Sequence, residues 1–191
     1  MKVIGLTGGV GSGKSKVLKL LKAEYQADII QADEVARELE EPGQAAFEQL
    51  VNKLGPSILD AAGRIDRRIL AALIFDRPKI RETVNAIVHP LTWERIRQLI
   101  EASEAELVVV EAALLDKVTE ELYDELWYVH AAAELRLERL ARTRGYSRER
   151  TLAIMKAQAA DEEFRRAADW VIDNNGSIED LRKQLETRLR R

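Results

Sequence analysis

Cysteine is absent from this chain, and histidine occurs only twice, as His89 and His130. Without cysteine the protein has no disulfide framework, no thiol nucleophile and no thiolate metal site. Two histidines are too few for a histidine-rich metal cluster. These absences exclude the disulfide-rich and thiol-dependent classes of protein.

Long apolar runs and an excess of basic charge are also missing. No run approaches the roughly 20 apolar residues of a membrane helix. The opening MKVIGLTGG lacks the apolar core of about 7–15 residues that a signal peptide has. The formal net charge is −3, whereas nucleic-acid binders usually carry a basic excess. We therefore expect a cytoplasmic protein that takes neither a membrane nor a nucleic acid as its partner.

Short apolar runs alternate with longer segments of helical period, and runs such as "LVVVEA" and "DWVIDN" are rich in β-branched residues. The expected strands are Lys2–Leu6, Ala27–Gln31, Glu106–Glu111, Leu126–His130 and Asp169–Asp173. Helices are expected over Gly13–Tyr25 and Ile178–Leu189, the second with Ser177 as its N-cap. Apolar strands separated by helices predict an α/β fold with a doubly wound, five-stranded parallel sheet.

Residues 33–103 differ from the rest, because every segment there has a helical pattern and none resembles a strand. Prolines and glycines punctuate the region at Pro42-Gly43, Gly55-Pro56, Gly63, Pro78 and Pro90. We interpret it as a helical insertion between the second and third strands of the sheet.

The stretch "GLTGGVGSGKS" contains Gly8-x-x-x-x-Gly13-Lys14-Ser15, a complete P-loop pattern between a strand and a helix. Its glycines allow backbone N–H groups to surround a phosphate, and the helix dipole adds positive potential. Lys14 is expected to bridge the β- and γ-phosphates of ATP, and Ser15 to ligate Mg²⁺. The predicted nucleotide ligands are Gly9, Val10, Gly11, Ser12, Gly13, Lys14 and Ser15.

A carboxylate follows the second strand, at Asp33. Acceptor substrates of small P-loop kinases meet the nucleotide at the carboxyl ends of the strands. Asp33 can accept the acceptor's proton there, or it can cap the following helix. The nearest match to a guanine-selecting Asn-Lys-x-Asp motif is Asn52-Lys53-Leu54-Gly55, which ends in glycine and argues against a GTPase.

Together, "GLTGGVGSGKS", "ADEVARELEEPG", "GRIDRRIL", "IVHP" and "VIDNNGS" resemble the dephospho-coenzyme A kinase family over nearly the whole chain. The resemblance implies Mg²⁺- and ATP-dependent phosphorylation of the 3′-hydroxyl of dephospho-CoA. It also implies a nucleotide-binding core (1–32, 104–131 and 159–191), a helical acceptor domain (33–103) and a lid (132–158). A monomer or weak homo-oligomer is expected.

The family's functional positions map onto this chain one by one. Asp33 matches the catalytic base, and Lys14 and the lid arginine Arg139 are the other expected catalytic residues. The implied acceptor contacts are Asp33, Arg37, Arg67, His89 and Leu114. Gln158 matches a lid glutamine, and Asn174, Asn175 and Gly176 match the loop beside adenine. His89 precedes a proline, so without the resemblance it would be interpreted as closing a turn.

The chain departs from the family pattern at three positions. Gln31 replaces the first aspartate of Asp-Ala-Asp, which removes one of two neighbouring carboxylates and with it an indirect contact to Mg²⁺. Ala113 replaces a proline, two residues after Glu111. Glu111 itself is either an acid that holds a Mg²⁺-bound water or a carboxylate facing solvent.

The third departure is Thr143, which stands where the family has a second lid arginine. Arg142 or Arg144 can substitute for it, and we name Arg142 as the candidate nucleotide ligand. The alternative for these arginines is an exposed charged helix. Two other functions stay open: a different P-loop small-molecule kinase, acting for example on a nucleoside monophosphate, and a nucleotide-binding regulatory module with little catalysis.

Overall fold

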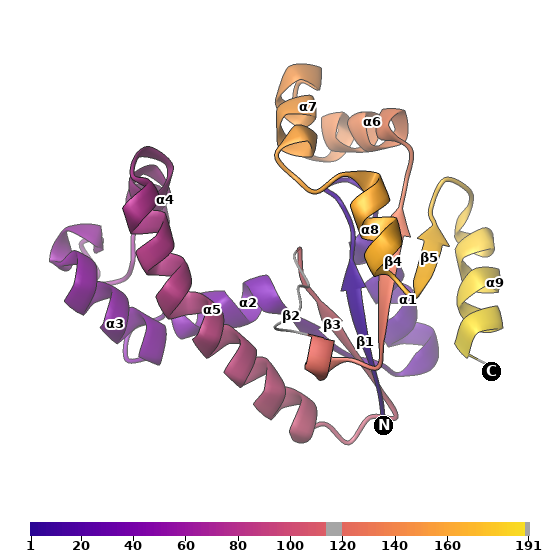
Figure 1. Cartoon of the computed structure of the whole chain (residues 1–191), viewed down its shortest axis with the longest axis horizontal. Helices are drawn as coiled ribbons and strands as arrows, with labels where there is room; N and C mark the ends of the chain where they lie inside the picture. Colours follow the sequence, from indigo (N-terminus) through magenta and orange to yellow (C-terminus); the bar gives the residue numbers. More distant parts are fainter. Residues whose placement is uncertain (114–119, 190–191) are drawn as a thin grey trace. The chain divides into compact units, whose positions relative to one another are not determined.

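The computed structural model describes residues 1–113 and 120–189 (Figure 1). Five strands form one sheet in the order β2-β3-β1-β4-β5. Their bounds are β1 Lys2–Thr7, β2 Asp28–Gln31, β3 Leu107–Glu111, β4 Glu125–His130 and β5 Trp170–Asp173. Strand β1 pairs in parallel with β3 and β4, and β4 pairs in parallel with β5. The predicted α/β sheet is confirmed, with each strand placed within one residue of its expected bounds.

Helices connect and cover the strands. Their bounds are α1 Lys14–Tyr25, α2 Ala32–Leu39, α3 Ala45–Leu54, α4 Arg67–Asp76, α5 Pro78–Glu101, α6 Ala133–Arg144, α7 Arg148–Lys156, α8 Asp161–Ala167 and α9 Ile178–Leu189, with short 3₁₀ turns η1 Pro56–Ile58 and η2 Glu120–Leu122. Ser177 caps α9 as expected: its Oγ accepts from the Asp180 amide at 3.1 Å, and Asp180 Oδ2 accepts from the Ser177 amide at 2.9 Å. This reciprocal pair is a capping box. No described helix combines the length and the apolar composition needed to cross a bilayer.

The chain divides into two compact units, residues 1–29 with 103–191, and residues 30–102. In the first unit, alternate residues of β4 face opposite sides of the sheet. Trp127 and Val129 join the buried core that α1 and α9 complete. Tyr128 faces the other side, where its ring stacks on Phe164 of α8 with centroids 5.0 Å apart. Helices therefore cover both faces of this sheet.

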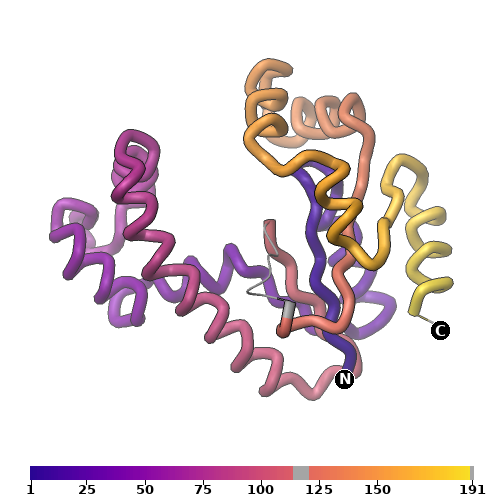
Figure 2. The backbone as a smooth tube through the Cα atoms, in the orientation of Figure 1, coloured from indigo at the N-terminus to yellow at the C-terminus, as the bar shows by residue number. Residues whose placement is uncertain are grey.

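Strand β1 lies between β3 and β4, so its carboxyl end is the point where successive crossovers diverge. Ligands of open α/β sheets bind at such switch points. Beyond β4 the chain forms α6 and α7 near the same end of the sheet and returns through α8 to β5 (Figure 2). The glycine-rich loop after β1 and the α6–α7 segment are thereby brought to one end of the first unit.

The second unit is helical, and its core forms where α3, α4 and η1 contribute apolar side chains to α5. The buried members are Ala46, Leu50, Ile58, Ile65, Leu70, Val84 and Val88. The expected helix break at Pro90 is wrong, because Pro90 lies inside the 24-residue helix α5. Proline removes one helical hydrogen bond, while core contacts of Val84 and Val88 hold the preceding turns in place.

Candidate active site

The glycine-rich loop lies between β1 and α1, as the motif predicts. Gly11 has φ 76° and Gly13 has φ 97°, so both adopt the left-handed conformation that glycine tolerates best. Gly13 is the N-cap residue of α1, and its neighbours Lys14 and Ser15 begin the helix. The Gly13 carbonyl accepts from the Lys16 amide at 2.9 Å, whereas the Lys14 and Ser15 amides precede the first intrahelical acceptor and are therefore available to an anion.

Lys14 connects the loop to the neighbouring strand. Its Nζ donates to the Gly8 carbonyl at 2.8 Å and lies 3.5 Å from Oε1 of Glu111, the last residue of β3. Both side chains are largely buried. The structure thus brings together two residues that the sequence separates by nearly a hundred positions, and it places an amine where the phosphates of a bound nucleotide are expected.

Ser15 and Glu111 are the predicted Mg²⁺ residues. Within the described ranges, no three histidine, cysteine, aspartate or glutamate side chains gather closely enough to hold a metal. Mg²⁺ at nucleotide sites takes one or two protein oxygens together with phosphate oxygens and water. The Ser15 hydroxyl and the Glu111 carboxylate are oxygen donors of this kind, so the residues present fit Mg²⁺, and their role as its ligands stays a prediction.

Arg139 reaches the loop from α6. Its Nη1 donates to the Ser12 carbonyl at 3.2 Å, and its Nη2 donates to the Asn174 carbonyl at 2.8 Å. Asn174 Nδ2 donates to the same Ser12 carbonyl at 2.6 Å. Asn174 and Ser12 are both buried, and a Cβ on Gly13 would overlap the Asn174 amide. Glycine at position 13 is therefore required by packing as well as by φ.

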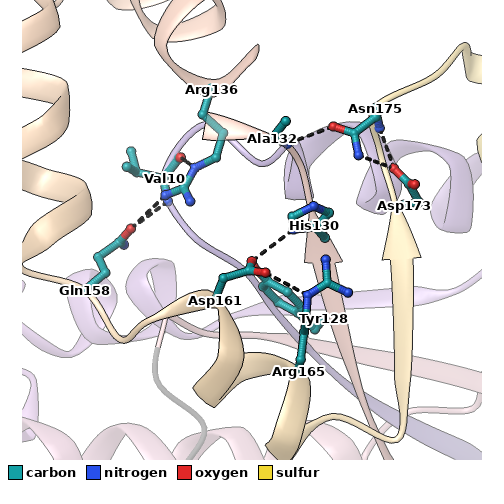
Figure 3. A network of polar contacts seen from close by, with 10 residues as sticks. All are labelled: Val10, Tyr128, His130, Ala132, Arg136, Gln158, Asp161, Arg165, Asp173 and Asn175. Carbon is teal, nitrogen blue, oxygen red and sulfur yellow. Dashed lines mark hydrogen bonds and ion pairs between the residues drawn. The ribbon is translucent and has the colours of Figure 1, made fainter. Parts of the chain in front are cut away.

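Arg136, one helical turn before Arg139, also contacts the loop. No role in the site was predicted for Arg136 from the sequence. Its Nε donates to the Val10 carbonyl at 2.7 Å, while Oε1 of Gln158 accepts from the Val10 amide at 2.9 Å (Figure 3). Arg136 Nη2 lies 3.3 Å from the same Oε1. We call Arg136 and Gln158 the Val10 clamp. Burial lowers the pKa of Arg136, against the opposing effects of Tyr128 and Asp161.

Asp161, three residues after Gln158, is bonded to β4. Its Oδ1 accepts from the Tyr128 hydroxyl and lies 2.9 Å from His130 Nδ1, and its Oδ2 accepts from Arg165 Nε at 2.7 Å (Figure 3). Burial is the largest single influence on the Asp161 pKa and raises it. The bonds from Tyr128, Arg165 and His130 together outweigh burial and lower the pKa to about 2. The start of α8 is thereby anchored by a carboxylate.

Asn175 and Gly176 were predicted to lie beside adenine. Asn175 Oδ1 accepts from the Ala132 amide at 2.7 Å, and its Nδ2 donates to Asp173 Oδ1 at 2.6 Å (Figure 3). A Cβ on Gly176 would crowd the Asp180 carboxylate. These contacts tie the loop after β5 to the start of α6, and contact with adenine stays a prediction.

For two predicted site residues of the first unit, Arg142 and Leu114, the described part of the chain shows no contact with the phosphate loop. Arg142 is exposed on α6, and Thr143 donates its hydroxyl to the Arg139 carbonyl at 2.7 Å. Leu114 lies outside the described residues. Their roles stay predictions.

In the helical unit, α2 begins at Ala32 with Gln31 at the N-cap position, so Asp33 lies within the first turn and is exposed. The interpretation of Asp33 as the helix cap is therefore wrong. Its negative charge still suits the positive end of the helix. Because the Asp33 side chain is exposed and does not cap the helix, its carboxylate oxygens are accessible to a substrate.

Arg37 and Arg67 share a neighbour, Glu40 at the end of α2. Arg67 Nη2 lies 3.8 Å from Glu40 Oε2. Burial raises the pKa of Glu40, while the charges of Arg67 and Arg37 oppose that effect. The charges of the two arginines predicted to hold an anionic acceptor thus both act on one half-buried acid.

Asp66 and His89 have separate structural settings. Asp66 caps α4, where its Oδ1 accepts from the amides of Arg68 at 2.9 Å and Ile69 at 3.3 Å. His89 is exposed inside α5, so the interpretation that it closes a turn is wrong. Capping by Asp66 fixes the first turn of α4, which carries Arg67.

Comparison with known proteins agrees with the motifs. A protein-family model described as dephospho-CoA kinase matches residues 2–180. The chain is 39% identical over 196 residues to the dephospho-CoA kinase of Carboxydothermus hydrogenoformans, covering 100% of this chain and 94% of that protein. It is 42% identical over 188 residues to the dephospho-CoA kinase of Frankia casuarinae, covering 97% of this chain and 81% of that protein.

Solved structures show the same fold. A crystal structure from Thermus thermophilus has a TM-score of 0.84 and 35% identity, covering 99% of this chain and 96% of that one. The dephospho-CoA kinase of Campylobacter jejuni has a TM-score of 0.70 at 23% identity, with coverage of 100% and 96%. The resemblance expected from the motifs is confirmed. Matched by the family model over most of its length, the chain belongs to the dephospho-CoA kinase family.

Proposed function

We propose that this protein transfers the γ-phosphoryl group of ATP to the 3′-hydroxyl of dephospho-CoA, giving CoA and ADP. The observation that carries the proposal is the family match over residues 2–180. It is supported by a phosphate loop whose Lys14 amine lies within reach of both the Gly8 carbonyl and the Glu111 carboxylate. A phosphate loop, its lysine and an acid at a neighbouring strand end recur in P-loop enzymes that transfer phosphoryl groups from ATP.

The proposed step is a direct in-line transfer. The 3′-oxygen forms a bond to the γ-phosphorus, and the bond from that phosphorus to the β,γ-bridging oxygen breaks, leaving the electron pair on ADP. Asp33 accepts the hydroxyl proton. Lys14 stabilises the charge that develops on the β- and γ-phosphates, and Mg²⁺ supplies further neutralisation when it is bound.

We assign the acceptor to the helical region 33–103, where Arg37, Arg67 and His89 are its proposed contacts. Arginine forks suit the phosphate groups of such an acceptor. We assign a lid role to residues 132–158, with Arg139 and Arg142 facing the nucleotide. The contacts of Arg139 with Ser12 and Asn174 support its place beside the phosphate loop.

The test is an acceptor panel with MgATP: dephospho-CoA, nucleoside monophosphates, shikimate and water. We expect release of ADP only with dephospho-CoA. The product should resist periodate, because phosphorylation removes the vicinal ribose diol, and two-dimensional phosphorus–proton NMR should place the phosphate on the 3′-carbon. Preference for another acceptor, or a 2′-phosphate product, would contradict the proposal.

The two alternative functions make different predictions in the same panel. A different small-molecule kinase would release ADP with its own acceptor, and a regulatory module would bind ATP without acceptor-dependent release. The family match favours neither. A cytoplasmic location and a monomeric or weakly associated state stay predictions.

A further inference from the structure

The Val10 clamp engages both polar backbone groups of a single loop residue. The Val10 amide donates to Gln158 Oε1 at 2.9 Å, and the Val10 carbonyl accepts from Arg136 Nε at 2.7 Å. Arg136 Nη2 also lies 3.3 Å from Gln158 Oε1, which closes a ring of three contacts (Figure 3). Arg136 lies on α6 and Gln158 between α7 and α8, so both are more than a hundred residues along the chain from the loop.

The clamp has a consequence for the next amide in the loop. The Val10 carbonyl and the Gly11 N–H belong to one peptide unit, and the described chain has no cis peptide bond. In a trans peptide unit these two groups point in opposite directions. The bond from Arg136 therefore directs the Gly11 N–H away from Arg136.

The same relation holds two residues later. The Ser12 carbonyl accepts from Arg139 and Asn174, so the Gly13 N–H points away from those side chains. Two alternate carbonyls of the loop are thus held by side chains of α6 and the loop after β5. Their partner amides therefore point away from these side chains, and an anion nest requires loop amides that are turned toward the phosphate.

Two further observations support a positioning role for Arg136. Gly9 is outside the set of loop glycines with left-handed φ, yet a Cβ there would overlap the Arg136 guanidinium. The Arg136 side chain therefore leaves no room for a residue larger than glycine at position 9 unless Arg136 moves. Gln158 lies just before α8, whose first residue Asp161 is bonded to Tyr128, His130 and Arg165. The acceptor atom of the clamp is consequently held on a fixed support.

We propose that Arg136 and Gln158 are positioning residues for the nucleotide: by holding the Val10 peptide groups they aim the Gly11 amide at the β-phosphate. The proposal rests on nucleotide binding at this loop, which is part of the proposed function. It does not require Arg136 to touch the nucleotide. The clamp acts through the backbone, so its loss should weaken binding of ligands that have a β-phosphate and spare those that lack one.

The experiment is a double-mutant cycle of Arg136→Ala and Gln158→Met, with binding of ADP and AMP measured by calorimetry in the presence of Mg²⁺. Each single variant should raise the Kd of ADP about tenfold, the order expected for one charge-assisted hydrogen bond. The Kd of ADP for the double variant should not exceed the larger of the two single-variant Kd values, because both changes break the same clamp. AMP, which has no β-phosphate, should bind all variants alike.

Two more variants separate the clamp from other roles. Arg136→Lys keeps the charge but loses the planar fork, so it should bind ADP nearly as weakly as Arg136→Ala. Gly9→Ala should weaken ADP binding in the native background and add little in the Arg136→Ala background. Arg166→Ala, at an exposed arginine of α8, is the matched control and should bind ADP normally.

The proposal is overturned by additive effects in the cycle, by full recovery in Arg136→Lys, or by equal losses for AMP and ADP. Thermal melts verify folding of each variant, and if Arg136→Ala fails to fold, Gln158→Met and Arg136→Lys still decide the question. Native protein that binds ADP but does not phosphorylate dephospho-CoA would refute the proposed function. The double-mutant cycle would still test the clamp, because it measures only ADP binding. Native protein that binds no ADP would refute both.

Discussion

Glu125, the first residue of β4, joins three separate parts of the first unit. Its carboxylate accepts from Lys2 of β1 at 2.9 Å, from Trp127 Nε1 at 2.8 Å and from Arg188 Nη2 of α9 at 2.9 Å. Burial is the largest single influence on its pKa and raises it. The hydrogen bonds from Trp127, Lys2 and Arg188 outweigh burial together and lower the pKa from 4.5 to about 2.

This lowering sets the size of the predicted effect. A difference of about 2.5 in pKa, at about 1.4 kcal/mol per pKa unit, corresponds to about 3.5 kcal/mol of stabilisation of the charged form. The Glu125 side chain is 22% exposed and its partners Lys2 and Arg188 are 38% and 30% exposed, so solvent screening reduces the figure. We expect Glu125→Gln to lower the free energy of unfolding by about 1–2 kcal/mol at pH 7.

The pH dependence has a definite sign. Because the native pKa is lower than the unfolded pKa, the contribution of Glu125 is fully present above pH 4.5 and is lost as the pH falls toward 2. Urea unfolding followed by tryptophan fluorescence, at pH 7, 5, 4 and 3, should show the native protein and Glu125→Gln converging at the acid end.

The matched control is Glu104→Gln, at an exposed glutamate of the same unit, which should match the native protein at every pH. A stability difference between native and Glu125→Gln that stays constant from pH 7 to pH 3 would refute the reasoning. So would the absence of any difference at pH 7, because the hydrogen bonds from Lys2, Trp127 and Arg188 would then contribute nothing to the charged form.

Three further predictions concern the site. Asp33→Asn should lower kcat by about 10²–10⁴-fold with little change in the Kd of ATP, and near-normal turnover in steady-state assays would remove Asp33 from the mechanism. Lys14→Ala should weaken ATP binding and lower kcat together, and unchanged kinetics would argue against the phosphate cradle. Gly13→Ala (φ 97°) should lose more stability in urea than Gly63→Ala (φ 74°), which should cost about 1 kcal/mol. The left-handed φ is unfavourable for alanine at both positions, but only at position 13 would the added Cβ also overlap the Asn174 side chain. Equal losses would show that the Asn174 contact is unimportant.

Local signals in the sequence predicted much of the fold. The β-branched run of β3 and the apolar runs of β1 and β4 are long enough to identify strands without tertiary information. The capping box at Ser177 likewise depends on residues three apart. Pro90 was misjudged, because a proline predicts a helix break locally while packing around Val84 and Val88 keeps α5 continuous.

What the sequence determined by itself is the place of the phosphate loop between β1 and α1, because the order of its glycines, Lys14 and Ser15 is a local pattern. Only the tertiary structure showed that Arg136 and Gln158 hold Val10, and that Tyr128 and Asp161 support them. Such contacts join segments that are far apart along the chain, and no short-range pattern of residue types encodes which distant donor will face a given carbonyl. The parallel order of the strands decides that, by setting which chain segments meet at the carboxyl end of β1.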